Sequence, residues 1–137
     1  MNGFPCGIMF HRIHKDGDKP KGQGSISDKD LRNLIIKLGP QNFLTPTQWC
    51  NIDNQQDKKN TKLCITFDDG LKSQHEIALP ILDEFNIKGF WFVFTKTFSG
   101  YYDRNEIANY LISCKFKNIK NFLPTFLKVS KLSKENL

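Results

Sequence analysis

The feature that most limits how this chain can fold is a predicted strand, helix and second strand in close succession. Residues 62–67 form a nearly continuous apolar run, Lys-Leu-Cys-Ile-Thr-Phe, which is typical of a strand buried on both faces in a parallel sheet. An apolar stripe at helical spacing follows from Ile77 to Phe85, and residues 88–94 form a second, aromatic strand. The sequence therefore predicts a right-handed βαβ unit with parallel strands, and so an α/β fold.

Segments upstream of this unit extend the pattern. Residues 6–12 form a short apolar run that predicts an earlier strand. Residues 31–38 carry an apolar repeat at helical spacing, after a predicted N-cap at Ser27. Residues 43–44 and 46–50 predict a brief strand and a short helix that begins at a proline. We therefore count three or four strands in the chain.

Two prolines interrupt predicted helices. Pro80 lies within the apolar stripe that ends at Phe85, so we expect either a kink or a helix that starts nearer Leu79. Residues 104–117 predict an amphipathic helix, and a second helical stretch runs through Phe126, Leu127 and Leu132. Pro124 is predicted to break this pattern.

The length of 137 residues is typical of one globular domain. We assign residues 1–100 to the N-terminal part of that domain and residues 101–137 to a basic helical segment, either an insertion or a truncated continuation. From Arg104 onward, seven Lys or Arg face two Glu, which accounts for most of the net charge of +6. Such a segment either binds polyanions or anionic lipid, or is a solvated face. We favour the solvated face and expect no nucleic-acid partner.

The apolar stretches, the first residues and the cysteines indicate where the protein is expected to be located. No apolar stretch approaches the roughly 20 residues of a membrane-spanning helix, so no transmembrane segment is predicted. The first residues lack the pattern of a secretory signal, so either the protein is cytoplasmic, as we expect, or Met1 is not the natural start of a longer precursor. Because Cys6, Cys50, Cys64 and Cys114 form no C-x-x-C pair, we interpret them as buried apolar side chains.

The motif that carries chemistry is Thr-Phe-Asp-Asp-Gly at residues 66–70, where a buried strand ends. Chemistry in α/β folds gathers at the carboxyl ends of strands. Two adjacent carboxylates, Asp68 and Asp69, point in different directions there, so that one is free to bind a cation and the other to act as a base. An isolated Asp-Asp-Gly is also ordinary turn chemistry, in which Gly70 supplies a positive φ. The surrounding sequence decides between these interpretations.

The surrounding segments give a family resemblance. The motif precedes Ala-Leu-Pro-Ile-Leu at residues 78–82 and Ile-Lys-Gly-Phe-Trp-Phe-Val at residues 87–93, and it follows Gly-Ile-Met-Phe-His-Arg-Ile at residues 7–13. Together these segments resemble the opening of the NodB-type polysaccharide deacetylases, a carbohydrate esterase family, over roughly residues 7–95. The resemblance implies a partial (β/α) barrel, truncated after three or four strands.

The same resemblance implies an activity and a set of roles. Members of the family are hydrolases of non-peptide carbon-nitrogen bonds that remove acetyl groups from N-acetylated glycans with zinc or another divalent cation. Asp68 corresponds to the catalytic base and Asp69 to a metal ligand, with His11, Thr66 and Gly70 as possible neighbours of the site. The glycan or polysaccharide precursor is the implied partner.

The chain departs from the family in its histidines. The family supplies two more metal ligands from a later pair of histidines, and a further histidine as general acid, whereas this chain has only His11, His14 and His75. We expect His14 to be solvated and His75 to lie on an exposed helix position. The predicted metal site is therefore incomplete, and the chain is expected to be inactive by itself.

Two alternatives to the deacetylase interpretation stay open at this stage. One is a non-catalytic glycan-binding or partner module that keeps a degenerate form of the fold. The other is a binder of nucleic acid or membrane surfaces through residues 104–137, which steep salt dependence of polyanion binding would reveal.

Overall fold

The computed structural model describes residues 5–19, 22, 24–52 and 62–131. Its centre is a three-stranded parallel sheet in the order β1 (Cys6–Phe10), β4 (Leu63–Phe67) and β5 (Phe90–Trp91). Phe10 pairs with Phe67, and Phe67 pairs with Trp91, so the carboxyl ends of the strands lie together at one edge. The predicted parallel βαβ unit is confirmed, although β5 is shorter than the predicted strand.

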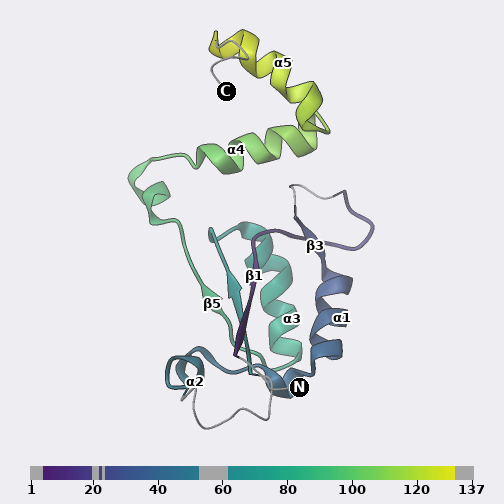
Figure 1. Cartoon of the computed structure of the whole chain (residues 1–137), viewed down its shortest axis with the longest axis vertical. Coiled ribbons are helices and arrows are strands. Elements are labelled where there is room, and N and C mark those ends of the chain that lie inside the picture. The colour runs from purple at the N-terminus through teal and green to yellow at the C-terminus, as the bar shows by residue number, and fades with distance from the viewer. Residues whose placement is uncertain (1–4, 20–21, 23, 53–61, 132–137) are drawn as a thin grey trace.

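Helices α1 (Asp28–Leu38) and α3 (Leu79–Glu84) lie beside one another along the sheet (Figure 1). The hydroxyl oxygen of Ser27 accepts a hydrogen bond from the Asp30 N–H at 3.0 Å, and Gly39 ends α1 with φ 81°. The predicted N-cap at Ser27 is therefore confirmed. The core between helices and sheet is apolar and buried, and it includes Leu31, Ile35, Ile65, Phe67, Ala78, Ile81, Leu82 and Ile87.

Smaller elements complete this part of the fold. Strands β2 (Ile13–His14) and β3 (Ile26–Ser27) form a second parallel pair. The 3-10 turn η1 (Pro40–Asn42) and helix α2 (Pro46–Cys50) follow α1. Phe43 forms an isolated parallel bridge with Leu63, where the brief strand is predicted.

Pro80 lies in the first turn of α3 (Leu79–Glu84), directly after helical backbone that begins at Lys72. The chain ahead of it, η2 (Gln74–Ala78), is a π-helical turn. The regular α-helix α3 starts at Leu79, near the predicted start, but helical backbone with a π-turn precedes it.

The C-terminal part is helical. After the 3-10 segment η3 (Thr95–Ser99) come α4 (Arg104–Tyr110), the π-helical turn η4 (Leu111–Lys115) and α5 (Ile119–Ser130). Helix α4 lies across the carboxyl edge of the sheet, and α5 lies beyond it (Figure 1).

Pro124 lies inside α5, so the prediction that it breaks the helical pattern is wrong. The rings of Phe122 and Phe126, one turn apart on either side of the proline, are stacked with centroids 5.6 Å apart. This packing favours a continuous helix across the one hydrogen bond that Pro124 cannot make. Leu132, which the sequence places in the same stretch, lies outside the described residues.

The interpretation of the cysteines as buried side chains is wrong for three of the four. Only Cys64, on the central strand, is buried; Cys6, Cys50 and Cys114 are exposed. Cys6 begins an edge strand, and the other two lie on short helical segments that do not contribute to the core. None of the helices among the described residues is long and apolar enough to cross a membrane.

Candidate functional site

The strand ends bring the predicted site residues to one edge of the sheet. His11 directly follows β1, and Asp68 and Asp69 directly follow β4. The backbone N–H of Asp68 donates to the Phe10 carbonyl at 3.1 Å, which continues the pairing of the two strands by one residue. His11 and the two aspartates therefore emerge side by side at the carboxyl ends of neighbouring parallel strands.

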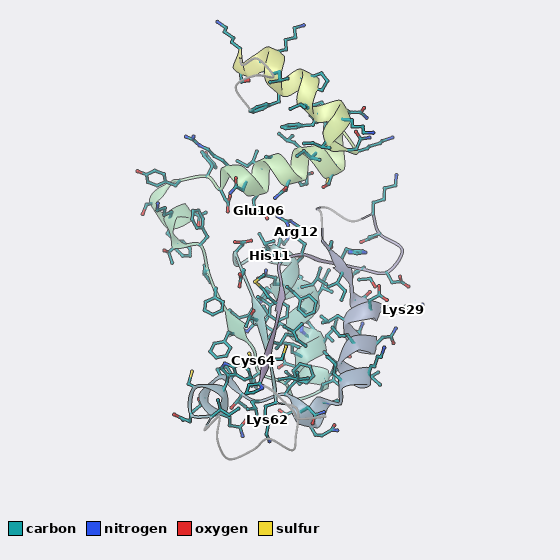
Figure 2. All side chains as sticks on the ribbon, in the orientation of Figure 1. His11, Arg12, Lys29, Lys62, Cys64 and Glu106 are labelled. Carbon is teal, nitrogen blue, oxygen red and sulfur yellow. The ribbon has the colours of Figure 1, made fainter. Side chains whose placement is uncertain are left out.

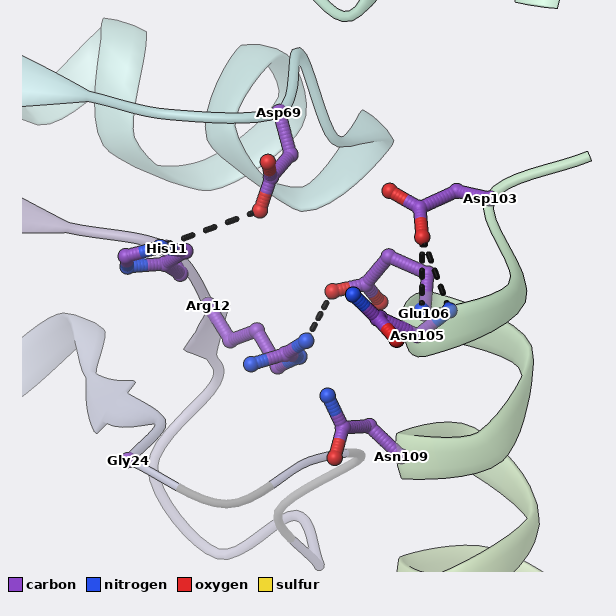
Figure 3. Close-up of a pocket in the computed structure, with 8 residues that line it drawn as sticks. All are labelled: His11, Arg12, Gly24, Asp69, Asp103, Asn105, Glu106 and Asn109. Atoms are coloured by element: carbon purple, nitrogen blue, oxygen red, sulfur yellow. Dashed lines mark hydrogen bonds and ion pairs between the residues drawn. The ribbon is translucent and has the colours of Figure 1, made fainter.

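His11 and Asp69 face each other across this edge, as Figure 3 shows. The imidazole Nε2 of His11 lies 3.9 Å from Oδ2 of Asp69, and the side chains are 38% and 30% exposed. This separation is too long for a direct hydrogen bond. Two donor atoms that approach from different strands at such a distance leave space for an atom or ion between them, open to solvent.

The turn that presents Asp69 has an unusual backbone. Asp69 and Gly70 both lie in the left-handed region, with φ 77° and 66°. Asp tolerates this conformation better than most side chains do. A Cβ at Gly70 would also lie 3.1 Å from Cγ1 of Val93. Glycine is therefore favoured at this position both by its positive φ and by the close approach of Val93. Thr66 lies inside β4, half-buried, one residue before the strand ends.

Gln74 joins the two strand ends, and sequence reasoning missed it. Its side chain is buried, and its amide nitrogen donates to the backbone carbonyls of His11, at 2.7 Å, and of Asp68. Its amide oxygen accepts from the Leu71 N–H at 3.2 Å. The available signal is that Gln74 lies three residues before Ile77 and so on the apolar stripe of the helix, where a polar side chain needs buried partners.

The first turn of α4 closes the other side of the site. The Asp103 carboxylate caps α4 by accepting from the N–H groups of Asn105, at 2.9 Å, and Glu106, at 3.1 Å. The Arg12 guanidinium forms an ion pair with Glu106, and Figure 2 shows the pair between the sheet edge and α4. The sequence did not indicate this contact, because the two residues are 94 positions apart.

The elements enclose a cavity of about 340 Å³ between the sheet edge and α4. Asp69 also lines a second cavity, of about 530 Å³, toward η3 and the aromatic side chains in and around it, Phe94, Phe98, Tyr101 and Tyr102. Asp68 is half-buried and is not among the described residues that line either cavity. Asp69 is thus the aspartate that faces open space. The residues that line the smaller cavity are His11, Arg12, Gly24, Asp69, Asp103, Asn105, Glu106 and Asn109.

The other two histidines lie away from this pair. His14 is half-buried in β2, and its Nδ1 lies 2.7 Å from the Ser25 hydroxyl, so the prediction that it is solvated is wrong. The short strand pair β2 and β3 covers it where a loop was expected. His75 is exposed on the π-helical turn, which confirms the prediction of an exposed helical position.

The imidazole nitrogen of His11 and the carboxylate oxygen of Asp69 are atom types that bind divalent cations, but two ligands are fewer than a catalytic site generally has. Catalytic zinc is bound by His nitrogen and carboxylate oxygen at about 2.0 to 2.2 Å, so two ligands at a tetrahedral angle lie about 3.4 Å apart. A movement of about half an ångström would bring His11 and Asp69 to that spacing. Within the described residues, however, no group of three or more His, Cys, Asp or Glu is placed to hold a metal ion. The pair fits two of the three protein ligands that such sites generally have.

Comparisons with known proteins place the fold. No protein-family model matches the chain, and no curated protein sequence matches it. Among solved structures, IcaB from Ammonifex degensii is similar with a TM-score of 0.60 and 20% identity, covering 82% of this chain and 50% of that one.

Two further structures agree. A de-N-acetylase from Aggregatibacter actinomycetemcomitans has a TM-score of 0.52 and 20% identity, over 64% of this chain and 36% of that one. The Streptococcus pyogenes deacetylase PplD, solved with acetate, has a TM-score of 0.52 and 18% identity, over 80% and 53%. The predicted resemblance to polysaccharide deacetylases is confirmed at the level of the fold. This chain spans about half or less of the length of these structures.

Proposed function

We propose that this chain carries part of the site of a metal-dependent N-deacetylase that acts on an N-acetylated glycan. The observation that carries the proposal is the pair of His11 and Asp69, which face each other 3.9 Å apart at the carboxyl edge of a parallel sheet. The likeness of the fold to deacetylase structures supports the same reaction class. In this proposal the sheet is the opening part of a (β/α) barrel, consistent with the share of those structures that the chain spans.

Each residue at the edge has a role in the proposal. Asp69 and His11 hold the cation, with zinc as the expected ion, through one carboxylate oxygen and one imidazole nitrogen. A bound zinc ion would lower the pKa of its water toward about 7 and polarise the acetamide carbonyl. Asp68 would accept a proton from the water as its oxygen bonds to the acetyl carbon. The carbon-nitrogen bond would then break as a proton is delivered to the leaving nitrogen, which gives acetate and an amine. Gly70 and the left-handed turn set the direction of Asp69.

The proposal also includes incompleteness. Among the described residues, no third His, Cys, Asp or Glu is placed with this pair to complete a metal site. Two ligands bind zinc more weakly than three, so the chain alone is expected to bind the ion weakly and to hydrolyse no substrate.

Cobalt(II) titration and a hydrolysis assay test this proposal together. Cobalt replaces zinc with visible absorption bands that report the ligands, and free amine released from an N-acetylglucosamine oligomer reports hydrolysis. We expect Asp69→Asn to lower the cobalt affinity at least tenfold and Asp68→Asn to leave it unchanged. Equal loss in the two variants would contradict the assigned roles.

The hydrolysis assay separates the remaining possibilities. No amine release is expected from the chain alone. Amine release by the wild-type chain with zinc, lost in Asp68→Asn, would support the reaction class but refute the proposed incompleteness of the site. Tight binding of the oligomer without any metal requirement would instead favour a glycan-binding module and refute the proposed metal site.

A further inference from the structure

The side chain of Gln74 bridges two chain segments that carry the candidate site. It is 1% exposed, and all three of its hydrogen bonds go to backbone atoms. Two of those partners are the carbonyl oxygens of His11 and Asp68, which belong to different strands 57 positions apart in sequence. A single amide nitrogen therefore fixes both strand ends where parallel pairing stops.

These contacts act on the geometry of the site through the peptide planes. The Asp68 carbonyl belongs to the peptide that enters Asp69, so holding it restricts the φ angle at which Asp69 leaves the strand. That angle is 77°, in a region that side chains other than Gly, Asn and Asp seldom adopt. The His11 carbonyl, held by the same nitrogen, limits rotation of the backbone that carries the imidazole.

The third contact fixes Gln74 itself. Its amide oxygen accepts from the Leu71 N–H, which lies just beyond the Asp-Asp-Gly turn, at 3.2 Å. The π-helical turn Gln74–Ala78 begins at this residue. Such turns insert one extra residue into a helix, often at functional sites. Here the turn starts with the side chain that reaches back to both strand ends.

We propose that Gln74 is the positioning residue of the site: by binding the carbonyls of His11 and Asp68 it sets the approach of the His11 imidazole to the Asp69 carboxylate. The inference rests on the proposed function for its metal readout, but the geometry that it concerns exists without metal. Gln74 is not among the described residues that line either cavity, and its three side-chain hydrogen bonds all go to backbone atoms, so it acts through the backbone.

Two substitutions separate positioning from stability. Gln74→Met keeps the length of the side chain and removes all three hydrogen bonds, whereas Gln74→Glu keeps the acceptor for Leu71 and removes both donors. Because both leave buried carbonyls unsatisfied, both also destabilise the fold. Ile35→Val, a buried substitution in α1, is the control for lost stability without any change at the sheet edge.

The first readout is the geometry of the metal-free protein by NMR. In the wild-type chain we expect a nuclear Overhauser effect between the His11 ring protons and the Asp69 β-protons. Couplings across the hydrogen bonds from the Gln74 amide to the two carbonyls are also expected. The effect between His11 and Asp69 should be lost in both Gln74 variants and kept in Ile35→Val. Absence of the couplings across the hydrogen bonds from the wild-type chain would overturn the inference without any variant.

The second readout is zinc affinity, measured by competition with a chromogenic chelator. We expect both Gln74 variants to bind zinc at least tenfold more weakly than Ile35→Val. Unchanged affinity and an unchanged Overhauser effect would overturn the inference. If the wild-type chain binds no zinc while the effect is lost in the Gln74 variants, the proposed function fails and the positioning role stands. If both Gln74 variants fail to fold, the couplings across the hydrogen bonds in the wild-type chain test the inference. Their absence would show that Gln74 does not bind the two carbonyls.

Discussion

Replacing Asp69 tests whether the turn at the end of β4 holds the left-handed conformation on which the site depends. At φ 77°, an alanine costs about 1 to 2 kcal/mol through the contact of its Cβ with the backbone, whereas glycine adopts this conformation freely. Alanine regains roughly 0.4 to 1 kcal/mol by restricting the unfolded chain. The difference between these two ranges is roughly 0 to 1.6 kcal/mol, so Asp69→Gly is expected to be more stable than Asp69→Ala by about 0.8 kcal/mol.

The matched control is Asn33, an exposed residue in the middle of α1. In a helix interior alanine is favoured over glycine by about 1 kcal/mol, so Asn33→Ala should be more stable than Asn33→Gly. Glycine is thus expected to give the more stable protein at position 69, and alanine at position 33. Because both substitutions at Asp69 remove the same carboxylate, the loss of its interactions cancels in the comparison.

Urea unfolding followed by circular dichroism measures these differences. For a chain of 137 residues, 1 kcal/mol corresponds to a change in melting temperature of roughly 2 to 5 °C, so thermal unfolding is an independent check. If Asp69→Ala is more stable than Asp69→Gly, as alanine is in a helix interior, the left-handed turn is refuted. For metal studies Asp69→Asn is the suitable variant, because Asn tolerates the left-handed conformation and carries no charge.

Two further predictions follow from ionisation and burial. The pKa of Asp28 is lowered, chiefly by a hydrogen bond from the Asp16 N–H, and the pKa of Glu84 is lowered by its hydrogen bond with Arg32. Since unfolded carboxyls titrate near pH 4, the contribution of these two groups is complete above about pH 5 and is lost as the pH falls toward the lowered values. Urea unfolding as a function of pH should show a smaller loss of stability between about pH 5 and 3 in Arg32→Met than in the wild-type chain, and an identical pH profile would contradict this. Burial raises the pKa of the Cys64 thiol, so it should react more slowly with a thiol reagent than the exposed cysteines do; equal rates, read by mass spectrometry, would contradict its buried position.

The sequence predicted the elements whose pattern is local. The strand at residues 62–67, the cap at Ser27 and the start of α3 at Leu79 all follow from apolar spacing and capping chemistry, and the structure has them. The sequence left open whether His11 lies near the Asp pair, and the parallel pairing of β1 with β4 brings them to one edge.

The errors and omissions concern tertiary contacts. Pro124 is tolerated inside α5 because aromatic stacking continues across it. The ion pair of Arg12 with Glu106 joins segments whose relative placement no local pattern encodes. Gln74 is polar on an apolar stripe, which indicates burial but not its partners, since these come from two other strand ends.

The account depends on His11 and Asp69 acting together on one cation, and a double-mutant cycle of zinc affinity tests this most directly. The dissociation constant for zinc is measured for the wild-type chain, His11→Ala, Asp69→Asn and the double variant. We predict that each single change weakens binding and that the second change adds little, giving a coupling of at least about 1 kcal/mol. Strictly additive losses, or zinc binding that neither change affects, would show that the two side chains do not share an ion.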